Sequence, residues 1–455
     1  MNIDIINPTT GKLLKSYPTL LLQQVGEFIE ETSQAQKSWK HTSFSERKQC
    51  MLHAATLLRT HQMDYATLIT QEMGKPITQA KAEIDKCARV CEYYAEQAEG
   101  YLAPIWIPTE HSKTYQCFNP LGIVLAIMPW NFPFWQVFRF AAPNLMAGNA
   151  CLLKHAHNSV GASLAIQEIF ERAGFPNGLF RSLIIDVDLV PAVIEHSAIA
   201  GVTLTGSERA GSVVASQAGK ALKKIVVELG GNDPYLILED ADIQLAVEQC
   251  VQSRLSNAGQ VCIAAKRILV VESIYDTFVK ALKHKMIQYS CGDPMDPNTT
   301  IGPLACEDLR KRIHDQVNRC IKEGAECVMG GELPPGEGFF YPPTLLLNIT
   351  PKSPVFTEEL FGPVVCIIKV KDEGEGILLA NETRFGLGAA VFTRDIARGE
   401  RIACQELEAG TCNVNSFVTS DPHLPFGGIK SSGFGRELGA DGIRAFMNIK
   451  TVVVG

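Results

Sequence analysis

Three short segments, far apart in the 455-residue chain, contain side chains that could do chemistry. The segment at 257–266, spelled NAGQVCIAAK, places Cys262 just after a glycine-containing turn, at what we predict to be the start of a helix. The partial positive charge of a helix N-terminus favours a thiolate, which is the nucleophilic form of cysteine. A single cysteine among 14 is nevertheless more often a small core residue than a catalyst, so this segment does not establish a nucleophile alone.

Two further segments offer an amide and a carboxylate. Asn131 lies between aromatic residues and two prolines in the segment MPWNFP at 128–133, so its amide is held rigidly. Glu228 ends a strand-like run just before Gly230 and Gly231, where bare backbone can approach a ligand closely and a carboxylate could act as a base. Taken alone, the segment at 128–133 favours a structural turn over a functional amide. A capping or solvent-facing role explains Glu228 as well as a catalytic role does.

One strand-to-helix turn offers backbone N–H groups to a phosphate, in the segment VTLTGSERAG at 202–211. Neither the GxGxxG dinucleotide fingerprint nor the GxxxxGK(S/T) phosphate loop occurs in the chain. Gly206 breaks the strand and Ser207 enters the first turn of the helix, an arrangement that can bind a phosphate but is common in other roles. Lys154, at the end of another predicted strand, could add a positive charge, although a solvated lysine is the simpler interpretation.

A scaffold of alternating strands and helices must position these segments. The N-terminal part predicts strands at 3–6 and 13–17 and then helices at 51–58, 64–73 and 81–99, the first with a Ser43–Glu46 capping box. Beyond it we predict strands at 122–127, 150–153, 183–185, 202–204 and 225–227, with helices at 135–147, 159–172 and 210–221. Such alternation is typical of βαβ units and a parallel sheet. The same texture continues from about 229, with strands at 266–271, 364–370, 388–392 and 451–454, which predicts an α/β fold of packed lobes with a cleft between them.

Composition excludes several classes of partner. The 42 basic and 49 acidic residues give a net charge of −7 without a long single-sign run, which argues against nucleic acid and anionic membrane. We find neither a leader sequence nor an apolar stretch long enough to span a membrane. Fourteen cysteines in a chain of this length are typical of a reducing compartment, and Cys87 and Cys91 have no second ligand pair nearby in sequence. We therefore expect a soluble cytoplasmic protein with no metal site.

Taken together and in this order, the three segments resemble those of the aldehyde dehydrogenase superfamily. The motifs that strengthen the resemblance are NPTTG at 7–11, GDP at 292–294, GPL at 302–304, EELFGP at 358–363 and PFGGIKSSG at 425–433. The match runs from Asn7 to Val454. The spellings KHA at 154–156, QVFR at 136–139 and AAKR at 264–267 are similar to the shorter bacterial succinate-semialdehyde dehydrogenases.

The resemblance implies a covalent mechanism. Cys262 attacks the aldehyde carbon, and the Asn131 amide and the Cys262 backbone N–H hold the oxyanion, typically about 3–4 kcal/mol per donor. After hydride transfer to a nicotinamide, Glu228 activates the water that hydrolyses the thioester. Glu437 is implied as a secondary carboxylate near the same channel. Because position 264 is alanine, a Cys-x-Cys disulfide cannot protect Cys262.

The resemblance also implies a bound NAD(P). The nucleotide-binding positions of the family correspond to Trp130, Lys154, Gly206 and Ser207, and the nicotinamide contacts to Glu359 and Phe361. Enzymes strict for NAD usually carry a glutamate three residues after this lysine, where this chain has His157. Without that negative charge the repulsion of a 2′-phosphate is removed and Lys154 remains to pair with it, so we expect NADP to be accepted.

For the substrate, Arg139 is the informative residue. It lies eight positions after Asn131, near the entrance of the aldehyde channel in this fold, and a guanidinium there could bind the far carboxylate of succinate semialdehyde. A structural ion pair is the alternative role for Arg139. The second arginine of the mitochondrial type is replaced by Ser256, with Arg254 two residues earlier, and the loop at 416–421 could supply a hydroxyl from Ser420 instead.

Other functions stay open within and outside this class. A broad-specificity or glutarate-semialdehyde enzyme fits the same residues, whereas transfer of the thioester to coenzyme A or a purely structural role is disfavoured by the presence of Glu228. The family implies three parts: a nucleotide-binding domain at 1–100 and 120–228, a catalytic domain at 229–435, and an oligomerisation extension at 101–119 and 436–455. The extension implies a homodimer or homotetramer.

Overall fold

Short apolar runs that are buried on both faces form the centre of the first sheet. The computed structural model describes residues 2–455. Its six-stranded sheet has the order β17-β9-β8-β5-β6-β7, and all pairs are parallel except β17 with β9. The strands are β5 (Ile123–Met128), β6 (Ala150–His155), β7 (Phe180–Ser182), β8 (Ile199–Thr205), β9 (Lys224–Glu228) and β17 (Gly433–Phe434). Strands buried on both faces read as continuous apolar runs, as β5 and β6 do.

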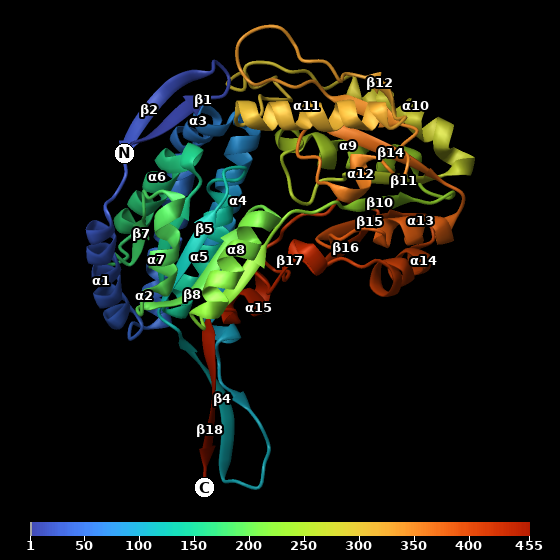
Figure 1. The fold of residues 1–455 in the computed structure, drawn as a ribbon. Helices are drawn as coiled ribbons and strands as arrows, with labels where there is room; N and C mark the ends of the chain where they lie inside the picture. The colour runs from blue at the N-terminus through green and yellow to red at the C-terminus, as the bar shows by residue number, and fades with distance from the viewer. Residues whose placement is uncertain (1) are drawn as a thin grey trace.

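Helices cover this sheet and, together with it, form what we term the first lobe (Figure 1). The crossover helices are α5 (Trp135–Ala147), α6 (Val160–Arg172), α7 (Val190–Glu195) and α8 (Glu208–Lys220). The N-terminal part adds α1 (Leu22–Trp39), α2 (Phe44–Thr60), α3 (Gln62–Met73) and α4 (Ile77–Tyr101), preceded by the antiparallel pair β1 (Asn2–Asn7) and β2 (Lys12–Pro18). The predicted capping box is confirmed, since Ser43 and Glu46 each accept from the other's backbone N–H.

The second lobe is built on a seven-stranded sheet of order β12-β13-β14-β11-β10-β15-β16, parallel except for β12 with β13. Its strands are β10 (Pro234–Ile237), β11 (Arg267–Val271), β12 (Glu326–Met329), β13 (Thr344–Leu347), β14 (Val364–Val370), β15 (Gly388–Phe392) and β16 (Thr411–Val414). Its helices are α9 (Ile243–Leu255), α10 (Tyr275–Met286), α11 (Glu307–Lys322), α12 (Pro354–Thr357), α13 (Glu373–Asn381) and α14 (Ile396–Arg401).

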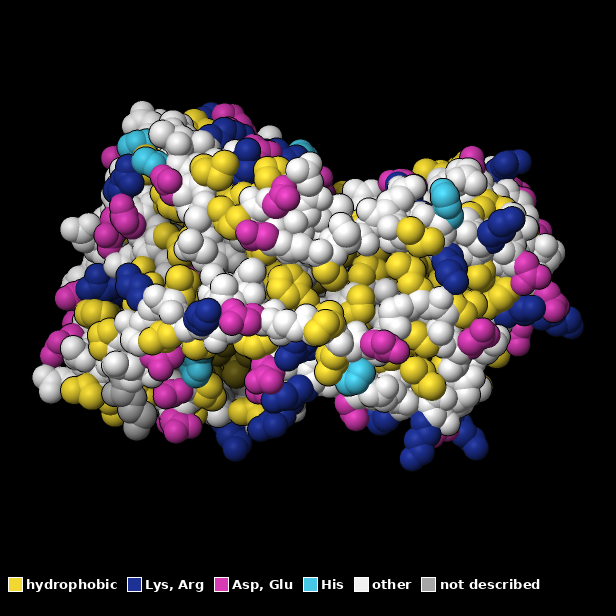
Figure 2. Space-filling model, turned by 90° about the horizontal axis from the view of Figure 1, so that it is seen from above, with side chains coloured by type: hydrophobic (Ala, Val, Ile, Leu, Met, Phe, Trp, Pro, Cys, Tyr) yellow, Lys and Arg dark blue, Asp and Glu magenta, His cyan; other side chains and the backbone are white. Residues whose placement is uncertain are grey.

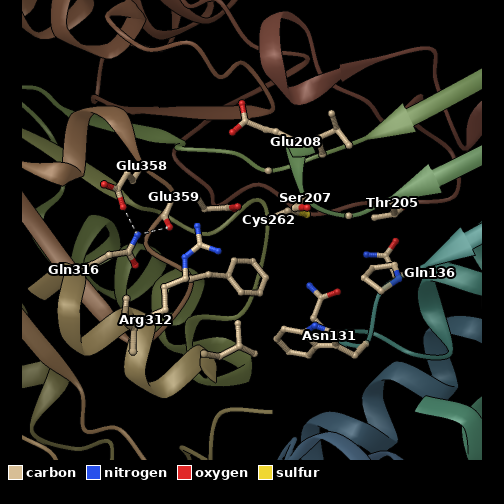
Figure 3. Close-up of a pocket in the computed structure, with 18 of the residues that line it drawn as sticks. Asn131, Gln136, Thr205, Ser207, Glu208, Cys262, Arg312, Gln316, Glu358 and Glu359 are labelled. Carbon is tan, nitrogen blue, oxygen red and sulfur yellow. Dashed lines mark hydrogen bonds between the residues drawn. The ribbon is translucent and has the colours of Figure 1, made fainter. Parts of the chain in front are cut away.

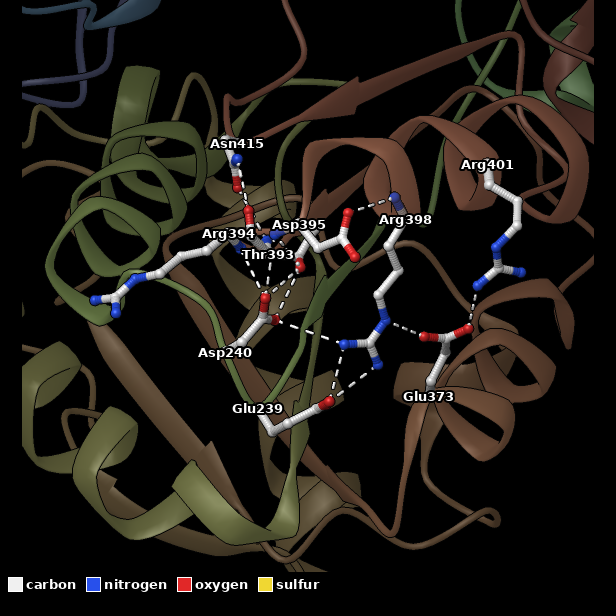
Figure 4. A network of polar contacts seen from close by, with 9 residues as sticks. All are labelled: Glu239, Asp240, Glu373, Thr393, Arg394, Asp395, Arg398, Arg401 and Asn415. Carbon is white, nitrogen blue, oxygen red and sulfur yellow. Dashed lines mark hydrogen bonds and ion pairs between the residues drawn. The ribbon is translucent and has the colours of Figure 1, made fainter.

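A polar network fixes two helices of the second lobe to the end of β10 (Figure 4). The Arg398 guanidinium lies against the carboxylates of Glu239 and Glu373, with Nη1 2.8 Å from Glu239 Oε1 and Nε 2.5 Å from Glu373 Oε2. Asp240 accepts from the Thr393 hydroxyl at 2.8 Å and from two backbone N–H groups of the turn before α14. Several charges that share partners form a network, which stabilises more than isolated surface pairs do.

A three-stranded antiparallel sheet projects from the body, with the C-terminus at its tip (Figure 1). Its order is β18-β4-β3, with β18 (Met447–Val454) pairing along the whole of β4 (Lys113–Pro120), and β3 (Ile105–Trp106) at the other edge. The short helix α15 (Gly439–Arg444) leads into β18. The predicted α/β fold with two parallel-sheet lobes and a small β extension is confirmed.

Charged and hydrophobic side chains occupy different parts of the surface. On the face shown in Figure 2, basic and acidic side chains are interspersed toward the edges, and hydrophobic side chains lie across the middle. No helix within residues 2–455 is long and apolar enough to cross a membrane.

The strand predicted at 183–185 is wrong. Strand β7 occupies Phe180–Ser182, and the residues after it form an irregular segment that leads to α7.

Candidate active site

A cavity of about 300 Å³ lies where the carboxyl ends of the first-lobe strands face the second lobe. Figure 3 shows the side chains that line it. The first lobe contributes Trp130, Asn131, Gln136, Thr205, Gly206, Ser207 and Glu208, and the second contributes Cys262, Arg312, Gln316, Glu358, Glu359, Phe361 and Arg384. Ligands of open α/β sheets bind at this edge, so the topology itself explains why residues distant in sequence meet here.

The loop before Cys262 has an unusual backbone. Asn257, Ala258 and Gly259 have φ values of 51°, 53° and 73°, three consecutive residues in the left-handed region. Non-glycine residues in this region are strained, and such strain persists only where the surroundings impose it. A Cβ atom on Gly259 would lie 2.1 Å from the carbonyl oxygen of Gly362, so glycine is required for this close approach. The nucleophile is therefore presented by a preorganised turn.

The side chain of Arg254 holds this backbone in place. Its side chain is fully buried and donates to the carbonyl oxygens of Gly259, Leu360 and Val364 at 3.2, 2.7 and 2.6 Å. Each guanidinium nitrogen donates to one of these carbonyl oxygens, and the side chain is fully buried and does not line the cavity. Arg254 therefore supports the loops of the site and is not a second clamp for a substrate carboxylate.

The predicted helix at Cys262 is wrong. Residues 262 and 263 form a turn that leads directly into β11, so no helix dipole acts on the thiol. Burial raises the pKa of Cys262 to about 11, although the positive charges of Lys266 and Arg139 act in the opposite direction. The thiol is thus protonated at neutral pH, and those two cations are what favours its ionisation.

Lys266 connects Cys262 to the loop that carries Glu359. Its ammonium donates to the Cys262 carbonyl oxygen at 2.5 Å and forms an ion pair with Glu359 at 3.0 Å. Glu359 also accepts from the Gly231 N–H at 3.1 Å, and a Cβ atom on Gly230 would lie 2.5 Å from its other oxygen. The glycine pair is explained by this close packing of the Glu359 carboxylate.

Asn131 reaches the cavity with hydrogen bonds to both its side-chain nitrogen and its backbone carbonyl group. Its Nδ2 donates to the Gln260 carbonyl oxygen at 3.0 Å, and its own carbonyl oxygen accepts from Asn257 Nδ2 at 2.9 Å. An amide nitrogen carries two hydrogens, so one donor is left beyond the bond to Gln260. Asn131 and Cys262 both line the cavity, which is the arrangement an oxyanion site needs.

Glu228 is the last residue of β9, and its side chain is buried away from solvent. Neither of its carboxyl oxygens has a hydrogen-bond partner, and a Cβ atom on Gly427 would lie 2.7 Å from Oε1. Burial, followed by the charge of Glu437, raises its pKa well above the usual range. The side chain does not line the cavity, whereas the next two residues, Leu229 and Gly230, do.

Arg139 is not at a channel entrance. Its side chain is 2% exposed and its guanidinium lies against the Glu437 carboxylate, while Nη2 donates to Thr205 Oγ1 at 3.3 Å. The predicted placement is wrong, because Arg139 lies on the second turn of α5 and faces the core. The ion-pair alternative is confirmed. Ser420 is also buried, and its hydroxyl oxygen accepts from Trp135 Nε1 at 3.0 Å.

On the other side of the cavity, the strand end of β8 carries the groups expected to meet a phosphate. Ser207 caps α8 by accepting from the Ala210 N–H at 3.3 Å. Glu208 in the first turn would repel an anion, but Arg384 neutralises it at 2.7 Å. Trp130 and Phe361 pack edge to face at 5.8 Å across the opening, one from each lobe.

Lys154 and His157 lie at and just beyond the end of β6, which β5 separates from β8. Burial lowers the pKa of Lys154 to about 8, with Asp186 acting in the opposite direction. His157 Nε2 lies 3.5 Å from Asp186, and burial together with Lys154 lowers its pKa below the usual value. His157 is therefore neutral at pH 7, and Lys154 provides the positive charge here.

Sequence reasoning missed the contribution of α11. Arg312 and Gln316 project from this helix into the cavity (Figure 3), and Gln316 donates to Glu358 at 2.9 Å. The helix is a strongly charged surface helix by its sequence. Nothing in its spacing distinguishes the cavity-facing residues from solvent-facing ones, so only the tertiary structure identifies them.

Comparison with known proteins agrees with this geometry. The model of the aldehyde dehydrogenase family matches residues 1–452. A probable succinate-semialdehyde dehydrogenase (NADP+) of Synechocystis sp. is 45% identical over 99% of both chains, and the succinate semialdehyde dehydrogenase (NAD(P)+) Sad of Escherichia coli is 42% identical over 98% of this chain and 96% of its own. The structure of succinic semialdehyde dehydrogenase from Streptococcus pyogenes in complex with NADP+ superposes with a TM-score of 0.97, at 38% identity over 99% of both chains.

The chain therefore belongs to the aldehyde dehydrogenase family. Within that family, the relatives named above all carry the name succinate-semialdehyde dehydrogenase or its equivalent, and each aligns over nearly its full length.

The burial of Cys262 generates a prediction for the protein without ligands. Alkylation of Cys262 by iodoacetamide should accelerate about tenfold per pH unit between pH 7 and 10, because only the thiolate reacts and its pKa is about 11. Mass spectrometry of the peptide that contains Cys262 measures this rate separately from that of the exposed Cys404, which serves as the internal control. A rate that levels off below pH 8 would contradict the buried, protonated thiol.

Proposed function

We propose that this protein oxidises succinate semialdehyde to succinate with NAD(P)+ in the cytoplasm. The observation that carries the proposal is the single cavity that joins Cys262 and the Asn131 amide to strand ends suited to a dinucleotide. The names of full-length relatives at 42–45% identity support the acidic semialdehyde as substrate. The hydroxyl group of Ser420, which lies against the Trp135 ring nitrogen, would meet the carboxylate end.

Covalent catalysis at Cys262 starts with transfer of the thiol proton to solvent water, and the charges of Lys266 and Arg139 favour the thiolate that remains. The sulfur attacks the aldehyde carbon, a C–S bond forms, and the carbonyl electron pair moves to oxygen. The Asn131 amide and the Cys262 N–H donate to this oxyanion. NAD(P)+, when bound, supplies the acceptor for the hydride that leaves the former aldehyde carbon, and a thioester to Cys262 remains.

Hydrolysis of the thioester requires a base. Glu228 removes a proton from water, the oxygen bonds to the carbonyl carbon, and the Cys262 sulfur leaves as thiolate with the C–S electron pair. The raised pKa of Glu228 makes its carboxylate a stronger base than an exposed one, at the cost of a smaller ionised fraction at neutral pH. Turnover limited by this step therefore increases with pH above neutrality.

The cavity fits a dinucleotide by its own features. Backbone N–H groups at the start of α8 are offered beside a neutralised Glu208, and two aromatic rings flank the opening. We propose that NAD(P) contacts the residues Trp130, Lys154, Gly206, Ser207, Glu359 and Phe361. With His157 neutral and Lys154 charged, a 2′-phosphate meets attraction on balance, so NADP+ is accepted as well as NAD+.

The projecting β sheet supports a proposal for assembly. Ile105, Ile449 and Val453 are 40%, 51% and 51% exposed and share one face of this sheet, an apolar surface that a partner subunit would cover. We propose a homodimer or homotetramer formed through 101–119 and 436–455, with the nucleotide-binding domain at 1–100 and 120–228 and the catalytic domain at 229–435. Transfer to coenzyme A and glutarate semialdehyde as substrate remain the competing chemical alternatives.

A kinetic panel tests the proposed function. Succinate semialdehyde should show a kcat/KM at least about tenfold above that of butanal, since a buried cation binds only the acidic substrate. Glutarate semialdehyde should fall between them. Reduced cofactor is measured at 340 nm with each aldehyde under saturating NADP+ and NAD+, with and without coenzyme A. Equal values for acidic and neutral aldehydes, or a dependence on coenzyme A, would reject the proposal.

Replacing Glu228 separates the two halves of the reaction. In Glu228→Gln, acylation should still release about one reduced cofactor per subunit in a burst, whereas steady-state turnover should fall about 100-fold or more because hydrolysis lacks its base. Stopped-flow absorbance measures the burst, and mass spectrometry detects the acyl group on Cys262. Loss of the burst together with turnover would assign Glu228 to acylation instead.

The cofactor proposal is tested at His157. His157→Glu should lower kcat/KM for NADP+ about 10- to 100-fold, because a carboxylate near Lys154 repels the 2′-phosphate, and should leave NAD+ within about threefold. The matched control is His53→Glu, which adds the same charge at an exposed histidine on α2. An unchanged NADP+ to NAD+ ratio in His157→Glu would show that this position does not face the ribose.

A further inference from the structure

Lys86 lies beside Ser420, the residue that we propose to meet the far end of an acidic aldehyde. It projects from α4, and its ammonium donates to the Ser420 hydroxyl oxygen at 2.9 Å and lies 4.1 Å from the centre of the Trp135 ring. Trp135 Nε1 donates to the same hydroxyl oxygen. Three elements thus meet at this point: α4, the start of α5 and the loop after β16.

Lys86 has no carboxylate of its own. Within residues 2–455 it forms no direct ion pair, and the carboxylates whose charges reach it have other hydrogen-bond partners, although the charge of Lys86 also helps to lower the pKa of Asp421. Glu83 pairs with Lys75 and accepts from the backbone N–H groups of residues 134 and 135, and Asp421 pairs with His423 at 2.6 Å. A partly buried ammonium without a counter-ion is costly unless an anion joins it.

Arg139 cannot act as a counter-ion for Lys86, and its own positive charge increases the need for an anion there. Its guanidinium is a second positive charge within electrostatic reach of Lys86, and it also acts on the Cys262 thiol. Because Glu437 neutralises Arg139 directly, the excess positive charge of this region resides on Lys86.

Ser420 is poised to take part in the same contact. Both of its hydrogen bonds, from Lys86 and from Trp135, use the hydroxyl oxygen as acceptor. The hydroxyl hydrogen is therefore free to be donated, and a hydroxyl whose oxygen accepts from an ammonium is a stronger donor toward an anion. An ammonium and an adjacent O–H donor together match the two oxygens of a carboxylate.

We propose that Lys86, with Ser420, binds the distal carboxylate of the substrate and is the principal determinant of selectivity for acidic aldehydes. The inference rests on the proposed function and deepens it. Arg139 then acts as a positioning residue, which holds Glu437 and contributes its charge to the region without a direct share in selectivity.

The test compares acidic and neutral substrates in Lys86→Met, which keeps the length of the side chain and removes its charge. The KM for succinate semialdehyde should rise about 10- to 100-fold with kcat within about twofold, and kcat/KM for butanal should stay within about threefold. The inhibition constant of succinate against the aldehyde should rise by a similar factor. Lys86→Arg should recover most of the affinity for both succinate semialdehyde and succinate.

Two further variants serve as controls. Arg89→Met removes a cation from the exposed face of the same helix, where it pairs with Asp85, and should change neither substrate. Arg139→Ala should lower kcat/KM for both aldehydes by similar factors, because Glu437 is left unpaired beside Glu228. Thermal unfolding within about 3 °C of the original protein establishes that each variant is folded.

The outcomes separate the two levels of the proposal. If the unaltered enzyme does not favour succinate semialdehyde over butanal and is not inhibited by succinate, both the proposed function and the role of Lys86 are rejected. If the unaltered enzyme has that preference and Lys86→Met retains it, the role of Lys86 alone is rejected. A larger selective loss in Arg139→Ala than in Lys86→Met would transfer the contact to Arg139.

Discussion

Three hydrogen bonds from one buried guanidinium hold the two loops that face each other across the active site. Arg254 binds the Gly259 carbonyl on the nucleophile side and the Leu360 and Val364 carbonyls on the side that carries the nicotinamide contacts. Burial of a guanidinium is tolerated only when its donors are used, so the loops and the arginine stabilise each other. The left-handed backbone before Cys262 depends on this support, and with it the position of the sulfur.

The electrostatics of the site follow from the same dryness. Burial opposes ionisation of both reacting acids, the Cys262 thiol and the Glu228 carboxyl group. Lys266 and Arg139 lower the cost of the thiolate, whereas Glu437 raises the cost of a second carboxylate next to it. Each reacting group is therefore neutral at rest and becomes a strong nucleophile or base only when its proton is removed. This arrangement suits a thioester that must persist long enough to meet water.

The sequence predicted what depends on local pattern or on family motifs, and failed where a distant segment decides. Runs buried on both faces predicted the central strands within a few residues, and the motifs around Cys262 and Asn131 meet at one cavity. The helix at Cys262 was wrong because Arg254 and the Gly362 carbonyl, not local propensity, set the backbone of 257–259. Arg139 was misplaced for the same reason, since its partner Glu437 comes from the other end of the chain.

The distribution of charge at the carboxylate end illustrates how a family site can change its residues and keep its chemistry. The position of a second arginine, just before the nucleophile, is Ser256 here, and the nearby Arg254 is occupied by backbone carbonyls. A positive charge is nevertheless supplied from α4, a helix outside the motifs, by Lys86. Because electrostatic attraction depends on where a charge lies in space and not on its place in the sequence, helices that carry no motif can determine which substrate is bound.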